Sequence, residues 1–407
     1  MTDRLGRALI VFLLLLSLLV RSPLLFLLDA LVLLVAGASA LWGRYCLAGV
    51  SYARRLGAER LFCGEATDLW VEIVNAKPLP LAWLKTADEF PAEVTVQRAE
   101  LGRASDHNRR LLNNLISVRW YELVRRHYRL TADKRGAFDF GPVQVSSGDI
   151  FGFRTRYLDL DYHHKLLVYP KLVRLEELGL RPARPLGEFG ALRRVNADPL
   201  RLAGARDYQP GESIRHVHWK ATARRGALQT KVFDPSAHQA QVIFLNSQTM
   251  ARAHEGVISE YFETAIVVAA SLAHAGLEAR LPVGLFTNGG VKEAERRVRL
   301  PASRHTAQST RILETLAQLT PFTFLPFETL LAIEAALLPY GATVIAVSAI
   351  VNEAILSKVL DLRAAGHPAA LILIGQSPEE YTTFPAALQE LPTYFVTRNW
   401  TEMESLR

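Results

Sequence analysis

Two apolar runs near the N-terminus constrain this chain more than any other feature. Residues 8–20 (ALIVFLLLLSLLV) form the first run, and residues 24–42 (LLFLLDALVLLVAGASALW) form the second. A helix that crosses a bilayer needs about 20 apolar residues, within a range of roughly 17–25. The second run is long enough, and the first becomes so when it includes residues 5–21. Pro23 disfavours helix at the residue before it, so a turn is predicted between the runs. We expect a transmembrane hairpin over residues 1–50.

A cleaved signal peptide is the alternative, because Arg4 and Arg7 precede the first apolar run as a basic region would. However, no small-x-small cleavage site follows that run, and a second apolar run comes next. Basic residues tend to stay on the cytoplasmic side, and the connecting loop holds only Arg21. We therefore expect a protein of the cell (inner, cytoplasmic) membrane, with both termini and the soluble body in the cytoplasm. The basic residues that flank the hairpin are Arg4, Arg7, Arg44, Arg54 and Arg55.

Asp29 lies inside the second apolar run, where a charged side chain is costly in lipid. It marks either a contact between helices or a position shallow enough to reach water. Because it lies only six residues past Pro23, we favour the water-exposed position.

The segment from residue 51 to residue 170 alternates short apolar runs with turn residues. In LWVEIVN, the side chains of Val71, Ile73 and Asn75 share one face of an expected strand. Glycine and proline clusters, such as Phe140-Gly141-Pro142, separate runs of this kind. Several short strands at this spacing predict a β-rich, sandwich-like domain or a barrel, with the strand order left open.

The C-terminal segment, residues 239–407, alternates strands with helices and predicts a doubly wound α/β domain. Its strands are fully apolar, as a parallel sheet covered on both faces requires. A linker and signature region, residues 171–238, precedes it. The expected strands are 241–247, 280–290 (ending in glycines), 343–349, 369–375 and 393–397; the expected helices are 255–278 (closed by Gly276), 305–319, 328–338 and 352–365.

The positive charge belongs to the membrane-proximal half of the chain. Residues 98–135 carry ten Lys and Arg against four Asp and Glu, whereas residues 319–407 carry four against nine. Attraction to an anionic leaflet is worth about 1 kcal/mol per basic residue near the surface. Nucleic-acid binding is the alternative, but no recognised binding motif accompanies the charge. We favour proximity to the membrane as the explanation of the positive charge.

The most unusual stretch is RDYQPGESIRHVHWKATAR, from Arg206 to Arg224, at the junction of the two soluble domains. Residues 208–212 predict a turn, because Pro fixes φ and Gly accepts positive φ. Residues 213–220 alternate in polarity and predict a strand. A short turn at residues 223–226 and a further strand over residues 227–234 are expected to follow.

The polar groups of this stretch allow several kinds of site. His216 and His218 supply only two metal ligands, with no cysteine nearby. Acid–base chemistry would combine Glu212 with a histidine, although nothing in the sequence fixes their geometry. A phosphate or nucleic-acid site would use a basic cluster with Trp219 stacking on bases. That cluster comprises Arg206, Arg215, Lys220, Arg224 and Arg225.

Two further interpretations do not require chemistry, and we favour them. Arg and Trp are common at interface hot spots, so the stretch is expected to dock a partner. Alternatively, Arg206 or Arg215 pairs with Asp207 or Glu212 and fastens a domain junction. The candidate binding or junction residues are Arg206, Tyr208, Gly211, Glu212, Arg215, His218, Trp219, Lys220 and Arg224.

These residues, with Ala223, resemble the signature R-x-Y-x-x-G-D-x-x-R-x-I-x-W-x-x-x-A-R of the family called domain of unknown function 58 (DUF58). Glu212 replaces the usual Asp and Val217 the usual Ile. The N-terminal hairpin, residues 64–75 and 134–153, and the α/β domain also resemble the layout of this family. The resemblance implies a von Willebrand factor A-like C-terminal domain and, as partner, a MoxR-type AAA+ ATPase together with other membrane proteins. It implies a membrane adaptor of no established activity.

Von Willebrand factor A domains hold a divalent metal through a D-x-S-x-S motif after their first strand. In this chain Asn246 takes the position of the Asp, and Gln248 and Met250 take those of the two Ser. Ser348 follows a later strand, where an acidic ligand would stand. Because Asn and Gln are neutral and Met is a poor ligand for a hard cation, we expect the metal site to be lost and no cofactor to bind.

The sequence and the family resemblance together predict a non-enzymatic, membrane-anchored scaffold or adaptor. No P-loop, zinc motif or nucleophile elbow occurs in the sequence, so no enzyme class has support from a motif. The alternative is a nucleic-acid-binding or phosphate-binding protein, or an enzyme, that acts through residues 206–224. A structural cell-envelope protein is a third class, and it would require the body to lie outside the cell.

Overall fold

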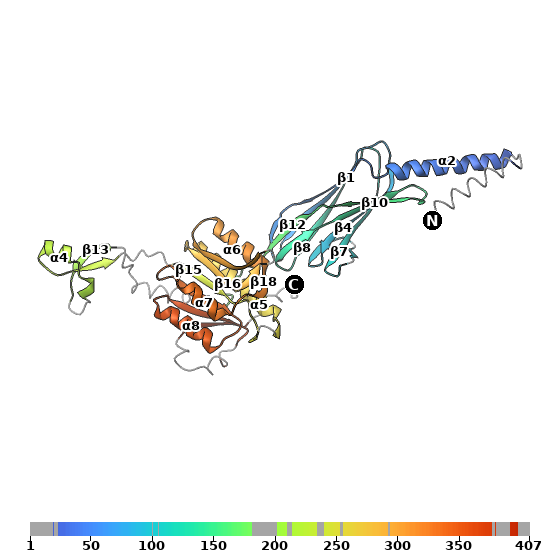
Figure 1. The fold of residues 1–407 in the computed structure, drawn as a ribbon. Coiled ribbons are helices and arrows are strands. Elements are labelled where there is room, and N and C mark those ends of the chain that lie inside the picture. Colours follow the sequence, from blue (N-terminus) through green and yellow to red (C-terminus); the bar gives the residue numbers. More distant parts are fainter. Residues whose placement is uncertain are drawn as a thin grey trace. The chain divides into compact units, whose positions relative to one another are not determined.

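A computed structural model describes most of the chain, which divides into two compact units, Met1–Val168 and Tyr169–Arg407 (Figure 1). The first expected transmembrane run, apart from Leu19, lies outside the described residues, and so does the turn of the hairpin. The described residues are 19, 23–99, 101–104, 106–180, 202–209, 214–233, 240–252, 255–291, 294–376, 379 and 391–397.

The second apolar run forms helix α2 (Pro23–Tyr45), as the sequence predicts. Its 23 residues give a length of about 34 Å, against about 30 Å for the hydrocarbon core of a bilayer. Among the described residues, α2 alone is long and apolar enough to cross a membrane, and a signal sequence would have the same properties. Asp29 is only 4% exposed, so the expectation that its side chain reaches water is wrong, while the contact between helices stays a prediction.

Unit 1 continues into a β domain with one apolar core. Its strands form three antiparallel sheets, and buried residues of all three pack together with Cys46 from the turn after α2. The expected β-rich domain is therefore confirmed, and the structure supplies the strand order. One sheet has the order β1 (Val50–Leu56), β3 (Ala66–Asn75), β8 (Leu123–Ala132), β5 (Val94–Gln97); the second β11 (Thr155–Leu160), β10 (Val143–Gly148), β4 (Leu81–Pro91), β7 (Arg109–Val118), β6 (Leu101–Arg103); the third β2 (Arg60–Phe62), β12 (His164–Tyr169), β9 (Gly136–Phe140).

The alternation of strand β3 follows the expectation. Val71, Ile73 and Asn75 are all buried. The Asn75 side chain donates from Nδ2 to the carbonyls of Leu79 and Arg119, at 2.9 and 2.8 Å. A polar residue is thus tolerated in the inward face because it ties two loops to the sheet.

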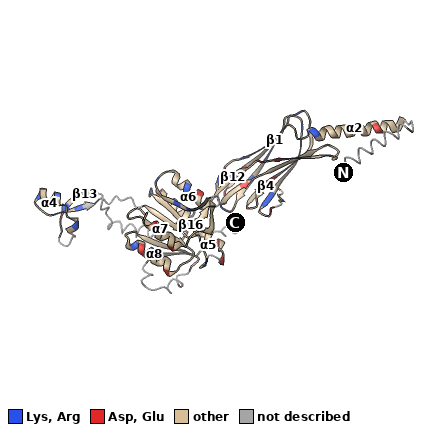
Figure 2. Cartoon of the chain, viewed as in Figure 1, with Lys and Arg blue, Asp and Glu red and all other residues tan. Residues whose placement is uncertain are grey.

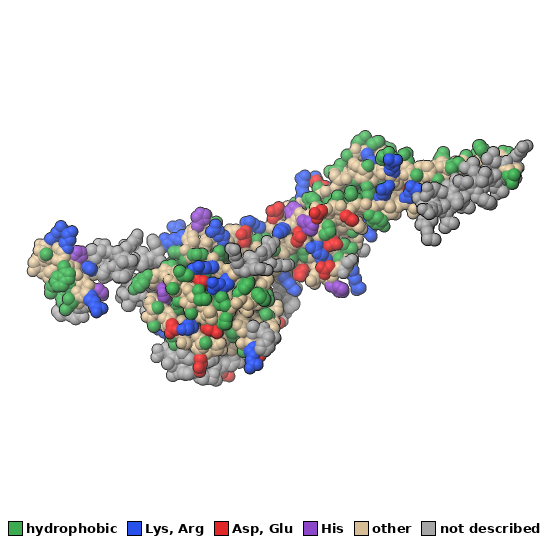
Figure 3. Space-filling view, viewed as in Figure 1, with side chains coloured by type: hydrophobic (Ala, Val, Ile, Leu, Met, Phe, Trp, Pro, Cys, Tyr) green, Lys and Arg blue, Asp and Glu red, His purple; other side chains and the backbone are tan. Residues whose placement is uncertain are grey.

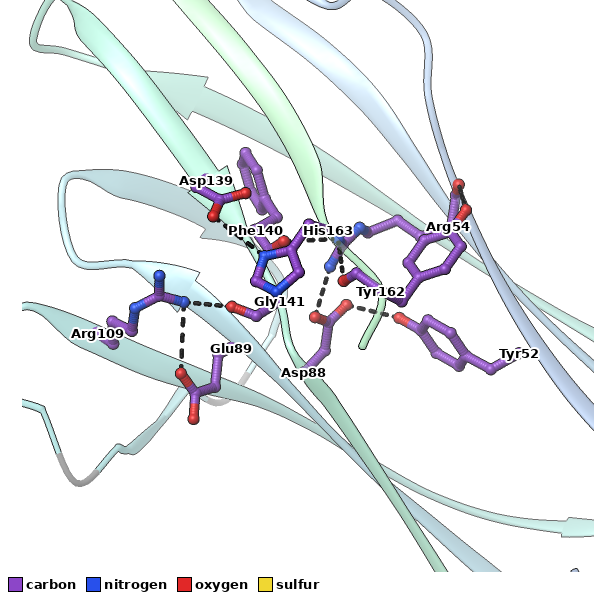
Figure 4. Close-up of polar contacts among 10 residues, drawn as sticks. All are labelled: Tyr52, Arg54, Asp88, Glu89, Arg109, Asp139, Phe140, Gly141, Tyr162 and His163. Carbon is purple, nitrogen blue, oxygen red and sulfur yellow. Dashed lines mark hydrogen bonds and ion pairs between the residues drawn. The ribbon is translucent and has the colours of Figure 1, made fainter. Parts of the chain in front are cut away.

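A buried ion pair crosses the core of the β domain (Figure 4). Arg54 of β1 donates from Nη1 to Oδ1 of Asp88 of β4 at 2.5 Å, and both side chains are almost fully buried. The Tyr52 hydroxyl donates to the other carboxylate oxygen at 2.5 Å. Arg54 also donates from Nη2 to the Phe140 carbonyl at 3.0 Å. Burial raises the pKa of Asp88, while the Arg54 charge and these hydrogen bonds oppose the rise.

Aromatic rings enclose the Arg54 guanidinium. Its central carbon lies 5.9 Å from the ring centre of Phe90, 5.5 Å from that of Phe140 and 5.4 Å from that of Tyr162. The Tyr162 hydroxyl donates to the Arg54 carbonyl at 3.1 Å. Cation–π contacts of this kind stabilise a desolvated guanidinium. Arg54 was counted among the basic residues that orient the hairpin, but in the folded protein it belongs to the core.

Unit 2 contains a seven-stranded mixed sheet. The order is β17 (Ala294–Ser303), β16 (Val283–Val291), β15 (Gln241–Leu245), β19 (Thr343–Ser348), β20 (Ala369–Ile374), β21 (Thr393–Val396), with β18 (Leu319–Thr323) paired to β16. Strands β15, β16, β19, β20 and β21 are parallel, whereas β17 and β18 run antiparallel to β16. The expected parallel sheet is confirmed at its centre, and the two antiparallel strands are additional.

Four helices accompany this sheet in the described residues. Helix α5 (Ser259–Glu278) contacts α6 (Ala307–Gln318), and α7 (Phe327–Ala335) contacts α8 (Glu353–Ala364) (Figure 1). Asn352 caps α8 by accepting from the Ile355 amide at 2.8 Å. These helices agree with the sequence analysis in number and place.

Three glycines were misinterpreted as ends of elements. Gly276 lies within α5, which continues to Glu278, so it does not close the helix. A Cβ at this position would lie 2.5 Å from the Gln241 side chain and 2.9 Å from that of Val283, so Gly276 allows α5 to approach the sheet. Gly289 and Gly290 lie inside β16, where a Cβ would collide with Ser247 and Phe324 respectively.

Replacing Arg54 by Met should destabilise the β domain by about 3–5 kcal/mol, because Asp88 is left as an unpaired buried charge. The double variant Arg54→Met/Asp88→Leu should recover a large part of this loss. Arg55→Met, on the exposed neighbour of Arg54, is the matched control and should change stability by less than about 0.5 kcal/mol. Hydrogen exchange of the β1 and β4 amides in the full chain measures each effect, and equal losses for Arg54→Met and Arg55→Met would contradict the account.

Candidate functional site

The unusual stretch folds as a small module, which we call the signature module: residues 202–209 and 214–233. Strands β13 (Leu202–Asp207) and β14 (Gln229–Phe233) pair in antiparallel fashion. A 3₁₀ turn, η2 (Ile214–His216), and helix α4 (Trp219–Arg225) lie between them in the chain. The strand expected over residues 213–220 is therefore wrong, and so is the turn at residues 223–226, most of which is helix. The second strand is confirmed.

His218 explains why a helix begins here. Its Nδ1 accepts a hydrogen bond from the Ala221 amide at 3.1 Å, which caps the first turn of α4. Its own amide donates to the Gln229 carbonyl at 2.7 Å, so the cap is fixed to β14. Gly226 ends the helix in the left-handed conformation, with φ of 69°. His218 therefore caps α4, a more specific role than the metal, acid–base, binding or junction roles expected from the sequence.

Gln229 holds the centre of the module. Its side chain is buried, and its Nε2 donates to Oδ1 of Asp207 at 2.5 Å. Its amide donates to the Thr222 hydroxyl at 3.0 Å. The Arg225 guanidinium lies 3.8 Å from the same Asp207 oxygen. Asp207 is thus engaged by Gln229 and Arg225, whereas Arg206 or Arg215 was the partner expected from the sequence.

The expected binding residues lie mainly on the surface of the module. Gly211 and Glu212 lie outside the described residues, so the acid–base pair and the Glu212 ion pair stay predictions. Trp219 is 64% exposed and Ile214 is 69% exposed. Tyr208 is partly buried, and its amide donates to the Leu228 carbonyl at 2.9 Å. The exposed basic or imidazole side chains are Arg206, Arg215, His216, Lys220, Arg224 and Arg225.

The described part of the module is strongly basic (Figure 2). It carries six Lys and Arg residues and one acidic residue, Asp207. Exposed apolar groups lie among these charges: Ile214, Trp219 and Leu228. An aromatic side chain surrounded by guanidinium and ammonium groups suits a protein hot spot or a stacked base.

A second candidate site lies at the carboxyl ends of β15, β16 and β19. Asn246 donates from Nδ2 to the Ser348 hydroxyl at 2.9 Å. Its Oδ1 accepts from the Gln248 amide at 3.0 Å and from Nδ2 of Asn288 at 2.9 Å. Asn288 in turn accepts from the Ser247 amide at 2.8 Å. We call Asn246, Ser247, Asn288 and Ser348 the amide network, and all four are buried.

The amide network does not fit a divalent cation. Its side chains are neutral and already hydrogen-bonded to one another, and a hard cation prefers several oxygen ligands that include carboxylates. The Gln248 side chain points its amide nitrogen at the carbonyls of Met250 and Ala251, at 2.9 and 3.2 Å. Among the described residues, no group of three or more His, Cys, Asp or Glu side chains is placed to hold a metal.

A cleft of about 400 Å³ opens beside the amide network. Gln248, Phe324, Glu328, Ile350 and Asn352 contribute to its lining. Ligands of open α/β sheets bind outside the carboxyl ends of the strands, where the strand order reverses, and β15 is that strand here. Of these lining residues, only Gln248 was expected at a site, because Phe324 directly follows β18, a strand that was not predicted.

Comparison with known proteins agrees with the resemblance. Residues 204–360 match the family described as "Protein of unknown function DUF58". The match begins in β13 and includes all but the first two residues of the signature module, together with the amide network. The chain is also 27% identical over 270 residues to "Uncharacterized protein YeaD" of Bacillus subtilis (strain 168). That alignment covers 64% of this chain and 60% of the relative, so the chain spans about three fifths of the relative's length.

Solved structures resemble only part of the chain. The CARDB domain of the PF1109 protein from Pyrococcus furiosus is 9% identical and covers 29% of this chain and 86% of its own, with a TM-score of 0.19. A cohesin module from Clostridium perfringens ATCC13124 is 12% identical and covers 29% and 96% respectively, with a TM-score of 0.20. Scores at this level carry no argument about fold or function.

If His218 serves as a helix cap, His218→Asn should keep the protection of the Ala221 amide, because Asn is a good N-cap residue. His218→Ala should lower the stability of α4 by about 1 kcal/mol. Hydrogen exchange of Ala221 in the full chain is the measurement. Equal exchange in His218→Ala and the unaltered chain would show that the cap is not formed.

Proposed function

We propose that this chain is a membrane-anchored, non-enzymatic adaptor that recruits a partner protein through its signature module. The observation that carries the proposal is the exposed pair Trp219 and Ile214 on a module with six basic residues and one acidic residue. Trp and Arg are enriched where binding energy concentrates. The internal contacts of Asp207, His218 and Gln229 fix the module without using Trp219, so this side chain is available to a partner.

The partner proposed is a MoxR-type AAA+ ATPase, as the family resemblance implies. Complementary charge supports a partner surface that is acidic around an apolar pocket, since opposite potentials speed association and exclude wrong partners. Other membrane proteins are proposed as further members of the same assembly.

Helix α2 is proposed as the membrane anchor rather than a cleaved signal, with the soluble body in the cytoplasm. Its Leu side chains are exposed along most of its length, as a lipid-facing helix requires. Arg44 in its last turn and Arg55 beyond it remain exposed, which supports a cytoplasmic position for this end.

The α/β domain is proposed to be a von Willebrand factor A-like platform that has lost its metal. Numbered along the chain from β15, its main strands stand in the order third, second, first, fourth, fifth, sixth, with an antiparallel edge strand. This order is typical of doubly wound sheets and supports the proposal. The role as a docking platform is an analogy at the level of fold.

Trp219→Ala should weaken binding to a purified MoxR-type ATPase by about 30-fold or more, as expected for a hot-spot tryptophan worth at least about 2 kcal/mol. Trp120→Ala is the matched control, because Trp120 is also 64% exposed but lies in the β domain. Titration of the full chain in detergent measures both affinities. Equal binding by the two variants, or no binding by the unaltered chain, would reject the proposal.

Nucleic-acid binding is the second candidate function, and the basic charge with exposed Trp219 favours it. It predicts measurable binding of single-stranded DNA at low salt, where affinity driven by phosphate contacts is strongest. Lys220→Ala/Arg224→Ala should then reduce the salt dependence of the affinity by about 1.4 in slope, at roughly 0.7 per phosphate contact. Absence of binding at low salt would remove this candidate.

A further inference from the structure

The loop between β10 and β11 is built around one carboxylate. Asp149 accepts from the Arg154 amide at 2.6 Å through Oδ1 and from the Phe153 amide at 3.3 Å through Oδ2. The Ser39 hydroxyl of α2 donates to the same Oδ2 at 2.8 Å. Burial by itself would raise the pKa of Asp149, but these hydrogen bonds outweigh it and hold the pKa below its usual value. The carboxylate therefore fixes residues 149–154, which we call the wedge loop, to the side of the helix.

The wedge loop exposes three large apolar side chains. Ile150 is 57% exposed, Phe151 is 51% exposed and Phe153 is 72% exposed. The rings of Phe151 and Phe153 stack with centroids 5.9 Å apart and planes 24° apart. None of these three side chains belongs to the apolar core of the β domain, so the core does not explain why a fixed loop exposes them.

The point at which the wedge loop contacts α2 indicates what surrounds its exposed apolar side chains. Ser39 lies six residues before the end of α2 at Tyr45, which corresponds to about 9 Å of helix. A second contact fixes the angle of the helix, since Arg156 of β11 donates from Nε to the Gly43 carbonyl at 3.2 Å. The wedge loop thus reaches back along a helix whose Leu34 and Leu41 are exposed.

A second loop at the same end of the β domain carries Trp120 and Tyr121, both largely exposed. The Tyr121 amide donates to the Lys77 carbonyl at 3.3 Å. The Lys77 ammonium donates to the carbonyls of Cys46 and Ala48, just past the end of α2. Trp and Tyr are enriched at membrane–water interfaces, where one end of the side chain is apolar and the other wet.

Basic side chains border both loops. Arg44, Arg119, Arg154 and Arg156 are exposed around this end of the domain. Figure 3 shows hydrophobic side chains along α2, with Lys and Arg gathered on the adjoining end of the β domain. Arginine beside aromatic residues suits the level of the lipid phosphates. Apolar side chains next to them would contact the acyl chains, which lie deeper in the bilayer.

We infer that the wedge loop inserts Ile150, Phe151 and Phe153 into the lipid interface beside α2, so that the β domain is seated on the bilayer. The occupant of this surface is lipid, because the apolar groups continue the lipid-facing surface of α2 and the basic residues match anionic headgroups. The helix and the loop then form one two-point attachment, which fixes the orientation of the domain. This inference rests on the proposal that α2 spans the membrane.

The test places a polarity-sensitive fluorophore (NBD) on introduced cysteines in the full chain with Cys63→Ser, where the remaining native thiol, Cys46, is buried away from the label. The protein is reconstituted into phosphatidylcholine vesicles with a minority of phosphatidylglycerol, in which separate lipid samples carry a nitroxide at a shallow acyl position (for positions 151, 153 and 93) or at a deep one (for position 34). Phe153→Cys is the main site, and Phe151→Cys is a second site in case the first variant does not fold. Glu93→Cys is the control, because it lies in the exposed turn at the other end of β4. Leu34→Cys reports on α2 itself.

The inference predicts blue-shifted emission and strong nitroxide quenching at positions 153 and 151, and neither effect at position 93. Quenching at position 34 without quenching at 153 and 151 would overturn the seated loop while leaving the anchor intact. A blue shift at 153 without quenching would also overturn it, since protein rather than lipid would then cover the loop. Absence of quenching at position 34 would instead refute the membrane anchor on which the inference rests.

Discussion

The ion pair between Arg54 and Asp88 is the interaction on which the β domain depends. It joins β1 of one sheet to β4 of another, and the Arg54 guanidinium also binds the carbonyl of Phe140 in β9 of the third. One side chain therefore connects all three sheets. Because both charges are buried, each is costly without the other, and their pairing allows only one alignment of these strands. The same alignment places β10 and β11, and with them the contacts to α2.

The junction of α2 with the β domain gives this alignment a functional meaning. The helix does not leave the domain through a flexible linker: Ser39 is bound by Asp149, Gly43 by Arg156, and Cys46 is buried in the domain core. A membrane helix fixed in this way determines the direction of the domain attached to it. If α2 spans a membrane, as proposed, these contacts hold the β domain at a defined orientation to it, whereas a flexible tether would only limit the distance between them.

Sequence patterns predicted the parts of the structure that follow from regular periodicity. The length of the second apolar run predicted α2, and fully apolar runs predicted the parallel strands around β15. Ion pairs across the core were not predictable, because Arg54 and Asp88 are 34 residues apart and each resembles a surface residue of a strand. Arg54 was for that reason assigned to the membrane flank.

The signature module shows a different kind of failure. Alternation of Ile214, His216 and His218 resembled a strand, but the residues that follow, WKATARR, are mostly good helix formers and Gly226 closes them. The sequence therefore contained a local signal for a helix, but the strand prediction gave more weight to the alternation of polarity. Gln229 gave no signal at all, since its role depends on Asp207 being brought beside it by the pairing of β13 and β14. Of the candidate site, the exposed Arg and Trp residues were therefore predictable, and their scaffold was not.

The central claim is that α2 holds the body of this chain at the cytoplasmic face of a membrane. The most direct measurement is labelling of Glu93→Cys, in the Cys63→Ser background, with a membrane-impermeant maleimide in bacterial spheroplasts. The account predicts no labelling in intact spheroplasts and full labelling after lysis, with the labelled protein remaining in the membrane fraction. Labelling before lysis would place the β domain outside the cell and contradict the account.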